Sequence, residues 1–392
     1  MGPPFTRVLG LKVSSVLLVS LGLGSSCWAQ TASYLPDSLR LEVRSAAEAA
    51  TQWLLGSQRE DGGWGSHHSP RPIEIFASAP GSQDAFRVAT TGLAVCALLD
   101  SPFGGAAKAL AVERGIDHLL EHCHVRRQSG IEHYNVWAFG FTLQAFGECL
   151  SKGASPGKEG SLRGACNALV ERLAGYQSVD GGWGYLSLQG YRTHPPAASS
   201  MSFTTATILV GLARVQDAGV EVPDVLIARA LESLRRCRMP KGPYSYGELW
   251  NRSPQSLING PAGAACRTPA CQLALILHGQ AITDSDRNRS LAALLVRYSN
   301  LQRAALRRPI PHESWCQISG YFYLYGHAYA AYLLERSPPG LRRRHAPALA
   351  RAVLACVQPD GSFWDYPLYS YHKPYGTAFA LLTLTRILGP GR

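Results

Sequence analysis

Hydrophobic residues in this chain fall into two kinds of segment that alternate along its length. In the first kind, apolar residues recur every three to four positions and charged residues occupy the opposite side, as in residues 38–55. This spacing predicts a helix with one buried stripe. In the second kind nearly every residue is apolar, as in the run Gly376–Leu382. A helix without a polar side is buried all round, so this kind predicts an inner helix.

Segments of the second kind are spread evenly over the chain. They are Thr90–Leu99, Val136–Cys149, Phe203–Val215, Ala264–Leu277, Tyr321–Leu334 and Tyr375–Leu388. Because one-sided helical segments lie between them, the pattern predicts an all-α fold. We expect an (α/α)6 toroid of twelve alternating inner and outer helices, six of each, with no substantial β-sheet.

A short motif closes several of the one-sided segments. Gln58–Gly65 and Gln177–Gly184 share a Gln, an Asp-Gly-Gly sequence and a Trp at the same spacing, and Gln358–Trp364 is a looser third copy. The glycine supplies the positive φ that a tight turn needs. The three tryptophans are 119 and 181 residues apart, which indicates a repeat of about sixty residues with degenerate copies near 124, 244 and 304. We interpret six residues as structural repeat anchors: Gln58, Trp64, Gln177, Trp183, Gln358 and Trp364.

The Gln-x-x-Asp-Gly-Gly-Trp repeat resembles that of the terpenoid cyclase and protein prenyltransferase superfamily, also described as the prenyltransferase and squalene oxidase/cyclase-type repeat. The resemblance covers about residues 38–388. It implies a single α/α toroid domain over these residues, in which the Gln and the Trp tie one outer helix to the next. It is far more specific for the fold than for an activity.

The N-terminal residues have the pattern of a secretory signal. Arg7 and Lys12 precede the apolar run Val13–Leu23, and small residues lead to Ala29. We expect residues 1–29 to be a signal peptide, residues 30–37 a short lead-in, and the mature protein to be secreted or periplasmic. A lipoprotein anchor at Cys27 is disfavoured because a glycine, and not an apolar residue, lies three positions earlier. The apolar run is too short for a comfortable span, so no membrane span is expected in the mature chain.

Composition narrows the classes of partner. The chain has 392 residues and a net charge of +11, which falls to +9 when Arg7 and Lys12 leave with the signal. No basic stretch is interleaved with aromatic residues, so nucleic acid is not expected as a partner. Nine of the ten cysteines remain after cleavage. Several of them lie in apolar runs as small core residues, whereas Cys266 and Cys271 are close enough in sequence for a local disulfide to stay open.

Polar and aromatic residues concentrate in two segments of the final third, residues 312–329 and 365–375. Each segment precedes or enters one of the last two inner helices, whose ends border the central cavity in a toroid. Polar groups that converge in an apolar concavity typically mark a ligand site. The candidate catalytic residues are Tyr325, His327, Tyr371 and His372.

The resemblance also implies a candidate metal site. In protein prenyltransferase β subunits, zinc is held by an Asp, a Cys two residues later, and a His that precedes a late inner helix. Cys316 and His372 resemble the Cys and the His, but position 314 is Ser and the nearest carboxylate is Glu313. Zinc held by Cys316, His372 and Glu313 is therefore a hypothesis from which the Asp of the family is missing.

Class II terpene cyclases protonate an alkene with the middle Asp of an Asp-x-Asp-Asp run. The near match in this chain is Asp284-Ser285-Asp286-Arg287, in which Arg replaces the last carboxylate. We interpret this run as a surface turn.

Three functions stay open. The first is an exported prenyltransferase/squalene-cyclase-like toroid with a central cavity, an apolar small-molecule ligand and an unassigned activity. The second is a carbohydrate-active toroid such as a polysaccharide lyase, in which imidazole, phenol and ammonium groups act as base, acid and charge neutraliser. Its candidate residues are His312, Tyr325, His327, His372 and Lys373. The third is a non-enzymatic binding scaffold.

Overall fold

The structure is a computed structural model that describes residues 2, 34–66, 82–126, 132–187, 200–248, 256–305, 323–365 and 372–389. Residues Ser33–Arg392 form one compact unit. The expected signal peptide falls outside the described residues except for residue 2, so cleavage and export remain predictions.

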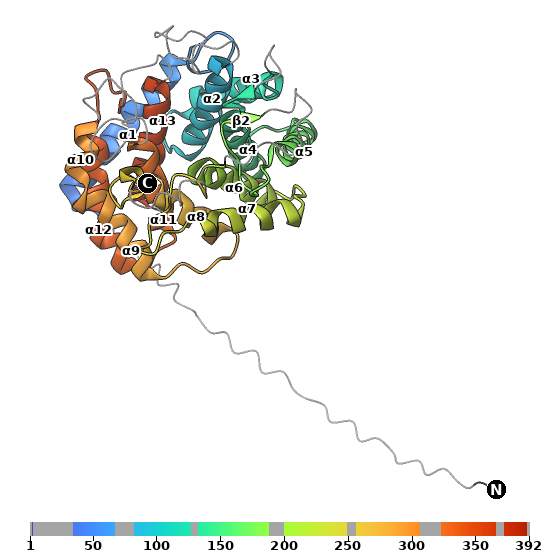
Figure 1. The fold of residues 1–392 in the computed structure, drawn as a ribbon. Coiled ribbons are helices and arrows are strands. Elements are labelled where there is room, and N and C mark those ends of the chain that lie inside the picture. Colours follow the sequence, from blue (N-terminus) through green and yellow to red (C-terminus); the bar gives the residue numbers. More distant parts are fainter. Residues whose placement is uncertain are drawn as a thin grey trace. The chain divides into compact units, whose positions relative to one another are not determined.

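The inner layer of this unit is a closed ring of helices (Figure 1). Within the described residues the inner helices are α2 Ser82–Asp100, α4 Asn135–Lys152, α6 Ser202–Asp217, α8 Thr268–Leu277, α11 Tyr323–Glu335 and α13 His372–Leu388. Each helix packs against the next in this order, and α13 packs back against α2. Because an inner helix has neighbours on every side, α4, α6 and α11 are buried at nearly every position.

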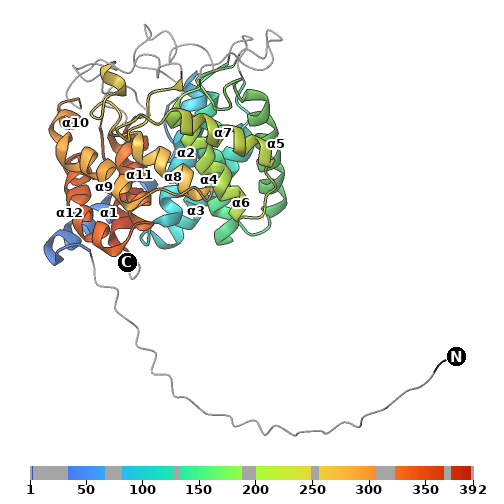
Figure 2. The same ribbon diagram turned by 60° about the horizontal axis from the view of Figure 1, so that its bottom comes forward.

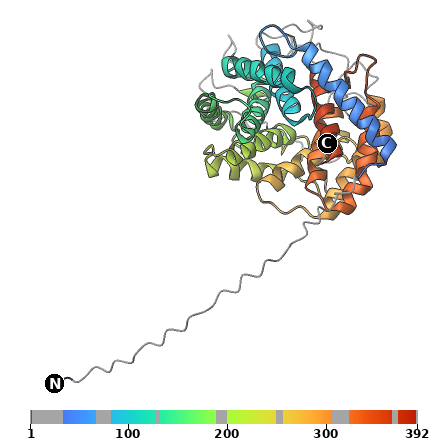
Figure 3. The ribbon, with the colours of Figure 1, turned by 180° about the vertical axis from the view of Figure 1, so that it is seen from behind.

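The outer layer surrounds this ring. Its helices are α1 Asp37–Ser57, α3 Gly105–His122, α5 Glu159–Tyr176, α7 Asp224–Arg236, α9 Asp284–Ala292 and α12 Pro339–Leu354. Figure 2 shows α12, α9, α7 and α5 following one another along the side of the unit, and Figure 3 shows α1 beside α13, which it contacts. The fifth outer position is irregular, because α9 continues into a π-helical turn, Ala293–Arg297, and then α10, Ser299–Ala305.

The described residues contain little strand. The two-residue strands β1 Glu132–His133 and β2 Leu186–Ser187 pair antiparallel, and a 3₁₀ turn covers Leu257–Asn259. In this part of the chain, no helix has the length and apolarity that a membrane crossing requires. The predicted all-α toroid is confirmed, and within the described residues the inner helices contain the predicted apolar runs, except that α8 begins at Thr268 and not at Ala264.

The two intact repeat motifs form the same turn after an outer helix. Gln58 Nε2 donates to Gly62 O at 2.9 Å and to Ala111 O of α3 at 2.8 Å. Gln177 Nε2 donates in the same way to its own turn and to Leu226 O of α7, at 2.8 and 2.9 Å. Each glutamine therefore ties the end of one outer helix to the next outer helix.

The glycines of the motif are required by close packing. Gly62 has φ +82°, and a Cβ there would lie 2.3 Å from Arg114 O of α3. Gly181 has φ +89° and would place a Cβ 2.4 Å from Arg229 O of α7. The first glycine of each motif thus meets two demands, a left-handed backbone and direct contact with the backbone of the next outer helix.

The tryptophans cap the outer helices. Trp64 and Trp183 are fully buried, and their Nε1 groups donate to Leu54 O and Leu173 O, each at 2.9 Å. Those carbonyls belong to the last turns of α1 and α5, where a helix has no further N–H groups to offer. The indole ring therefore packs in the core, and its N–H group donates to a carbonyl that the helix itself leaves without a donor.

The third copy of the motif is aligned one residue differently from the sequence-based interpretation. The backbone N–H groups of Trp64, Trp183 and Phe363 each donate to the hydroxyl of a threonine on the following inner helix, at 2.9 to 3.0 Å. Phe363, which is fully buried, thus occupies the tryptophan position. Trp364 Nε1 has no hydrogen-bond partner among the described residues.

Gln358 is displaced in the same way. Gln358 N donates to Ser362 O at 2.7 Å, which is the bond that Arg59 N and Ser178 N make in the intact copies. The glutamine position is therefore taken by Val357, whose side chain has no amide. Among the described residues, Gln358 Nε2 donates to Cys356 O alone, at 3.1 Å. The assignment of Gln358 and Trp364 as anchors equivalent to the other four is corrected accordingly.

Candidate functional site

Aromatic side chains from inner helices on opposite sides of the toroid meet in its interior. Trp137 of α4 lies 5.9 Å from Phe203 of α6 and 6.3 Å from Tyr325 of α11, between ring centroids. Phe379 of α13 lies 5.8 Å from both Tyr325 and Phe141 of α4. Side chains of four inner helices therefore form one continuous aromatic cluster, which we call the interior aromatic cluster.

The tyrosine hydroxyls of α11 form hydrogen bonds with α6 in the interior. The hydroxyl of Tyr325 lies 3.1 Å from Thr207 Oγ1 and donates to Phe203 O at 3.2 Å. Tyr329 donates to Thr207 Oγ1 at 3.3 Å. Burial raises the pKa of Tyr325 well above its usual value and that of Tyr329 to about 12, so both phenols stay neutral.

The cluster is less covered near the N-terminal ends of the inner helices. Trp137, Tyr185 and Tyr375 are half-buried, whereas Phe203 and Tyr325 beneath them are buried. Tyr185 precedes β2, and its ring lies 6.4 Å from that of Trp137. Tyr375 is in the first turn of α13, 4.7 Å from Phe379. The partly exposed aromatic surface is therefore at this end of the ring.

The C-terminal ends of the inner helices meet in a buried network of ion pairs. Asp100 ends α2 and pairs with Arg386 of α13 and with Lys152 of α4, the latter at 2.7 Å. Arg386 Nη1 also pairs with Glu335 of α11 at 2.7 Å, and its guanidinium lies 3.7 Å from the centroid of the Tyr332 ring. Side chains of four inner helices thus join at this end.

The ion pairs of the network lower the pKa of Asp100. Burial on its own would raise the pKa of Asp100, but the charges of Arg386 and Lys152 outweigh burial and lower it. Glu148 is likewise paired with Arg214 and Lys152. A proton donor for an alkene would have to be a protonated carboxylic acid, and Asp100 is held in the opposite state.

Of the predicted catalytic residues, the two whose side chains are described, Tyr325 and His327, are not brought together. Tyr325 faces the interior, whereas His327 lies on the other side of α11 with Tyr323. His327 is fully buried, its Nδ1 is 2.7 Å from Tyr323 O, and Tyr323 OH donates to Ala352 O of the outer helix α12. Burial, and then the charge of Arg303, lower the pKa of His327 to about 4. His327 is therefore a neutral core residue between two layers, which corrects its assignment to the cavity.

The remaining predicted site residues lie at the edge of what is described. Glu313, Cys316, Tyr371 and His312 fall outside the described residues, and of His372 only the backbone, at the start of α13, is described. Among the described residues, no group of three His, Cys, Asp or Glu side chains is arranged to hold a metal ion. The zinc hypothesis thus stays a prediction. Lys373 pairs with Asp360 of the third repeat turn, outside the interior cluster.

Two further sequence expectations are settled in the described residues. Asp284 and Asp286 lie in the first turn of the outer helix α9, where Asp286 Oδ2 pairs with Arg238 at 3.0 Å. This run is therefore a surface feature, as interpreted, although it is helical and not a turn. Cys266 and Cys271 are both free thiols, so the local disulfide left open above is not formed.

A second concave site, which sequence reasoning missed, lies between α2 and α3. It has a volume of about 220 Å³ and is lined by Asp84, Arg87, Val88, His118, Glu121, His122, His124, Val125 and Arg126. The signal that was present in the sequence is the pair His118 and His122, four residues apart, which places both imidazoles on one face of a helix. Their ring centroids are 4.4 Å apart.

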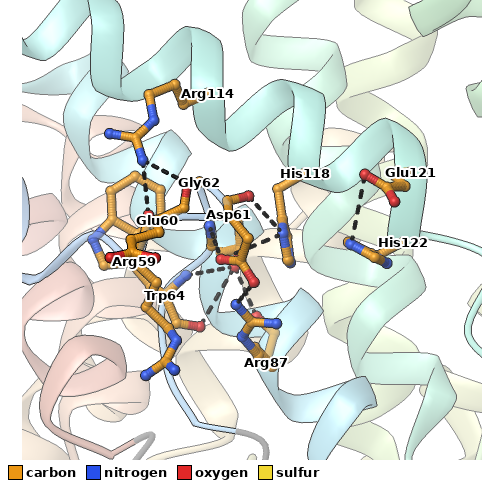
Figure 4. A network of polar contacts seen from close by, with 12 residues as sticks. Arg59, Glu60, Asp61, Gly62, Trp64, Arg87, Arg114, His118, Glu121 and His122 are labelled. Atoms are coloured by element: carbon orange, nitrogen blue, oxygen red, sulfur yellow. Dashed lines mark hydrogen bonds and ion pairs between the residues drawn. The ribbon is translucent and has the colours of Figure 1, made fainter.

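The first repeat turn holds two of the lining side chains, Arg87 and His118, through Asp61 (Figure 4). Asp61 accepts a hydrogen bond from Gly63 N at 3.1 Å and pairs with Arg87, while its carbonyl oxygen lies 3.1 Å from His118 Nδ1. Burial raises the pKa of Asp61, but the hydrogen bonds from Arg87 and Gly63 lower it to about 2. Burial, and then Arg87, lower the pKa of His118 to about 4. The turn thus holds an ionised Asp61 beside a neutral imidazole.

Comparison with known proteins agrees with the fold. No family model matches the chain. A stretch of 221 residues is 29% identical to drimenyl diphosphate synthase of Streptantibioticus cattleyicolor and covers 54% of this chain but 35% of that enzyme. The chain therefore spans about a third of the length of this curated relative.

Solved structures of the type II terpene cyclase MstE from Scytonema match nearly the whole unit. The apo enzyme has a TM-score of 0.54 at 16% identity and covers 89% of this chain and 98% of that chain. Variants of MstE were solved with merosterolic acid A as product and with geranylgeranyl dihydroxybenzoate as substrate, and they match with TM-scores of 0.55 and 0.53 at 15% identity. The chain thus has the α/α toroid fold of a terpenoid cyclase, and the resemblance inferred from the repeat is confirmed at the level of the fold.

Proposed function

We propose that this chain is an exported terpenoid cyclase-like toroid whose interior binds an elongated apolar small molecule of the terpenoid class. The observation on which the proposal rests is the interior aromatic cluster, with half-buried Trp137, Tyr185 and Tyr375 at one end and the ion-pair network of Asp100 and Arg386 at the other. The proposed ligand would enter at the end where these rings are half-buried.

The chemistry of the surface favours an apolar ligand over a carbohydrate. Aromatic side chains offer large apolar faces, and the phenols of Tyr325 and Tyr329 already spend their hydrogen-bonding capacity on Thr207 and the backbone. A sugar would need convergent polar groups that are not already paired. The residues considered for lyase chemistry do not meet, since His327 and Lys373 lie away from Tyr325.

The proposal is one of binding and not of cyclisation. Cyclisation started by alkene protonation needs a neutral carboxylic acid at the cavity, whereas Arg386 and Lys152 lower the pKa of Asp100 at the C-terminal ends of the inner helices. The Asp284–Arg287 run lies on an outer helix. The relatives act on terpenoids, which supports the ligand class, while the activity remains unassigned.

The test is a fluorescence and stability titration of the exported full chain with farnesol and geranylgeraniol. We expect both alcohols to raise the melting temperature, since saturation at about a hundred times Kd stabilises a folded protein by about 2.7 kcal/mol. Ligand contact with Trp137 would also quench its fluorescence. Trp137→Phe should lose this quenching, whereas Trp53→Phe, a matched change at a half-buried Trp on the outer helix α1, should retain it.

Two results would count against the proposal. One is a titration in which neither alcohol changes the melting temperature or the fluorescence. The other is stabilisation by an acidic polysaccharide in place of the prenyl alcohols, which would support the carbohydrate-active alternative. Export is tested separately by sequencing the N-terminus of protein recovered outside the cytoplasm, where a start at residue 30 is expected.

A further inference from the structure

Arginines gather on one outer helix, α12, with no acidic residue among them. Residues 336–359 contain five arginines and neither Asp nor Glu. The outer helices α1, α3, α5 and α9 differ, because each contains at least as many acidic as basic residues. Like charges on one helix repel each other, so this concentration costs the free protein stability and favours an anionic partner.

Three of the five arginines are exposed and have no partner within the described part of the chain. Arg342 donates to backbone carbonyls that precede the helix, and Arg336 pairs with the neighbouring glutamate. The side chains of Arg343, Arg344 and Arg351 are exposed, and no described residue forms an ion pair or a hydrogen bond with them. Their charges are therefore available to a partner outside this chain.

The unpaired arginines lie along one side of α12. Arg344 and Arg351 are seven residues apart, which places them on the same face of the helix about 10 Å apart, and Arg343 is next to them. Two more exposed arginines, Arg297 and Arg303, lie on the adjoining π-helical turn, which packs against α12, and on α10, which packs against that turn. Figure 2 shows α9, α10 and α12 on the same side of the unit. We call these five arginines the arginine face.

An exposed aliphatic side chain accompanies the arginine face. Val296 immediately precedes Arg297 in the π-helical turn and is 66% exposed. An anionic polymer in water offers charge but no apolar region, whereas the interface of an anionic bilayer offers both. The combination of unpaired arginines with an exposed valine therefore favours a lipid surface over a polymer.

We propose that the arginine face binds the surface of an anionic lipid bilayer. The guanidinium groups would donate hydrogen bonds to the phosphodiester oxygens of the headgroups, a geometry to which the planar arginine fork is suited. The contact is peripheral, since no helix in the described part of the chain could cross a membrane. It would hold the ring beside the phase in which an apolar ligand dissolves. That consequence rests on the proposed function, whereas the lipid contact itself does not.

The strength of the contact depends on how many arginines reach the lipid surface. Each basic residue near an anionic membrane strengthens binding by about fivefold. The attraction decays over a Debye length of about 10 Å at 0.1 M salt, so charges on other outer helices contribute little. Removing three arginines of the face should therefore weaken binding by about a hundredfold.

The experiment is co-sedimentation of the exported protein with vesicles of phosphatidylcholine, alone or mixed with phosphatidylglycerol. We expect binding to the mixed vesicles at low salt and release at about 1 M salt, where the Debye length is about 3 Å. No binding to the mixed vesicles, or equal binding to both kinds, would overturn the proposal. No terpenoid is present, so such a failure would leave the titration with prenyl alcohols, and with it the proposed function, unaffected.

A triple variant locates the contact on α12. Arg343→Gln, Arg344→Gln and Arg351→Gln together should reduce binding to the mixed vesicles by about a hundredfold without changing the melting temperature, because all three side chains are exposed. The control removes three exposed charges from other parts of the ring, namely Arg59→Gln, Arg126→Gln and Lys241→Gln. The control should bind as the original protein does. Equal losses in both triple variants would mean a general effect of net charge and would refute the arginine face.

Val296→Thr separates a lipid surface from an anionic polymer. This change keeps the size of the side chain but adds a hydroxyl, and it should weaken binding to the mixed vesicles severalfold. Val225→Thr is the matched control, because Val225 is also 66% exposed but lies on α7, and it should leave binding unchanged. If the protein bound dextran sulfate more tightly than the vesicles, and Val296→Thr changed neither, the partner would be an anionic polymer and the proposal would be wrong.

Discussion

Replacing Trp183 by Phe separates the two roles that the repeat tryptophan has in the structure. Trp183 is fully buried, and its Nε1 donates to Leu173 O, at the end of α5, at 2.9 Å. Phe363 stands at the equivalent position in the last repeat, so a six-membered ring alone is compatible with this place. Phe keeps the aromatic ring but removes the N–H group and the rest of the indole.

The expected loss follows from these two terms. A buried carbonyl left without its donor costs about 1–3 kcal/mol. The apolar area that Phe no longer buries adds about 1 kcal/mol at about 25 cal/mol per Å². We therefore expect Trp183→Phe to lower the free energy of unfolding by about 2–4 kcal/mol, and Trp183→Ala by about 3–5 kcal/mol.

The measurement is urea unfolding monitored by circular dichroism. The urea midpoint of the variant is compared with that of the original protein, provided that the dependence of the free energy on urea is the same in both. The control is Trp53→Phe, because Trp53 is half-buried and its Nε1 donates to the exposed carboxylate of Asp360 at 3.2 Å. This change should cost less than about 1 kcal/mol. If Trp183→Phe left the midpoint unchanged, or if both variants lost the same amount, the helix-capping role of the indole would be wrong.

Three other expectations follow from the described contacts. Gly62→Ala should destabilise far more than Gly105→Ala in thermal unfolding, because both glycines have positive φ but only at Gly62 would the Cβ meet a backbone oxygen, Arg114 O at 2.3 Å. Because the pKa of His118 is lowered from 6.5 to about 4, the unfolded chain binds more protons than the folded chain between these pH values. Acid should therefore destabilise the protein across this window, and His118→Ser should reduce the dependence of the free energy of unfolding on pH. A pH dependence that His118→Ser leaves unchanged would refute this expectation. Thiol titration in denaturant without reductant should find at least eight free cysteines per chain, and fewer would reveal disulfides that the structure lacks.

The fold could be predicted from the sequence because its signals are local and repeated. A fully apolar run such as Phe203–Val215 has no stable place except inside, and the glycine that follows the Asp of each motif has the positive φ that a tight turn favours. The misplaced third copy shows the limit of this reasoning. Alignment by residue type placed Gln358 and Trp364 at the anchor positions, and both are wrong by one residue. Alignment on the Asp-Gly pair, Asp360 and Gly361, would have placed Val357 and Phe363 there.

The sites were harder to predict, since they depend on which face of a helix a side chain occupies. Tyr325 and His327 are two residues apart, and on a helix that spacing places them on different sides of α11, one in the interior and one against α12. The paired carboxylates at the C-terminal ends of the inner helices come from helices far apart in sequence, so no window of the chain contains them. His118 and Arg87 meet only because the first repeat turn lies between α2 and α3.

Ring closure has a consequence for how the chain reaches its native state. The contacts that seal the ring are among its longest in sequence: Arg386 pairs with Asp100 across 286 residues, and Trp53 bonds to Asp360 across 307. In an open array of repeats the first units can fold while later ones are still being made, because each unit needs only its neighbours. Here α2 packs early against α3 and α4, but the faces of α1 and α2 that contact α13 stay uncovered until α13 is available, so closure comes late and slowly. A chain cut before α13 should therefore lose the whole ring and aggregate, and not merely lack its last repeat.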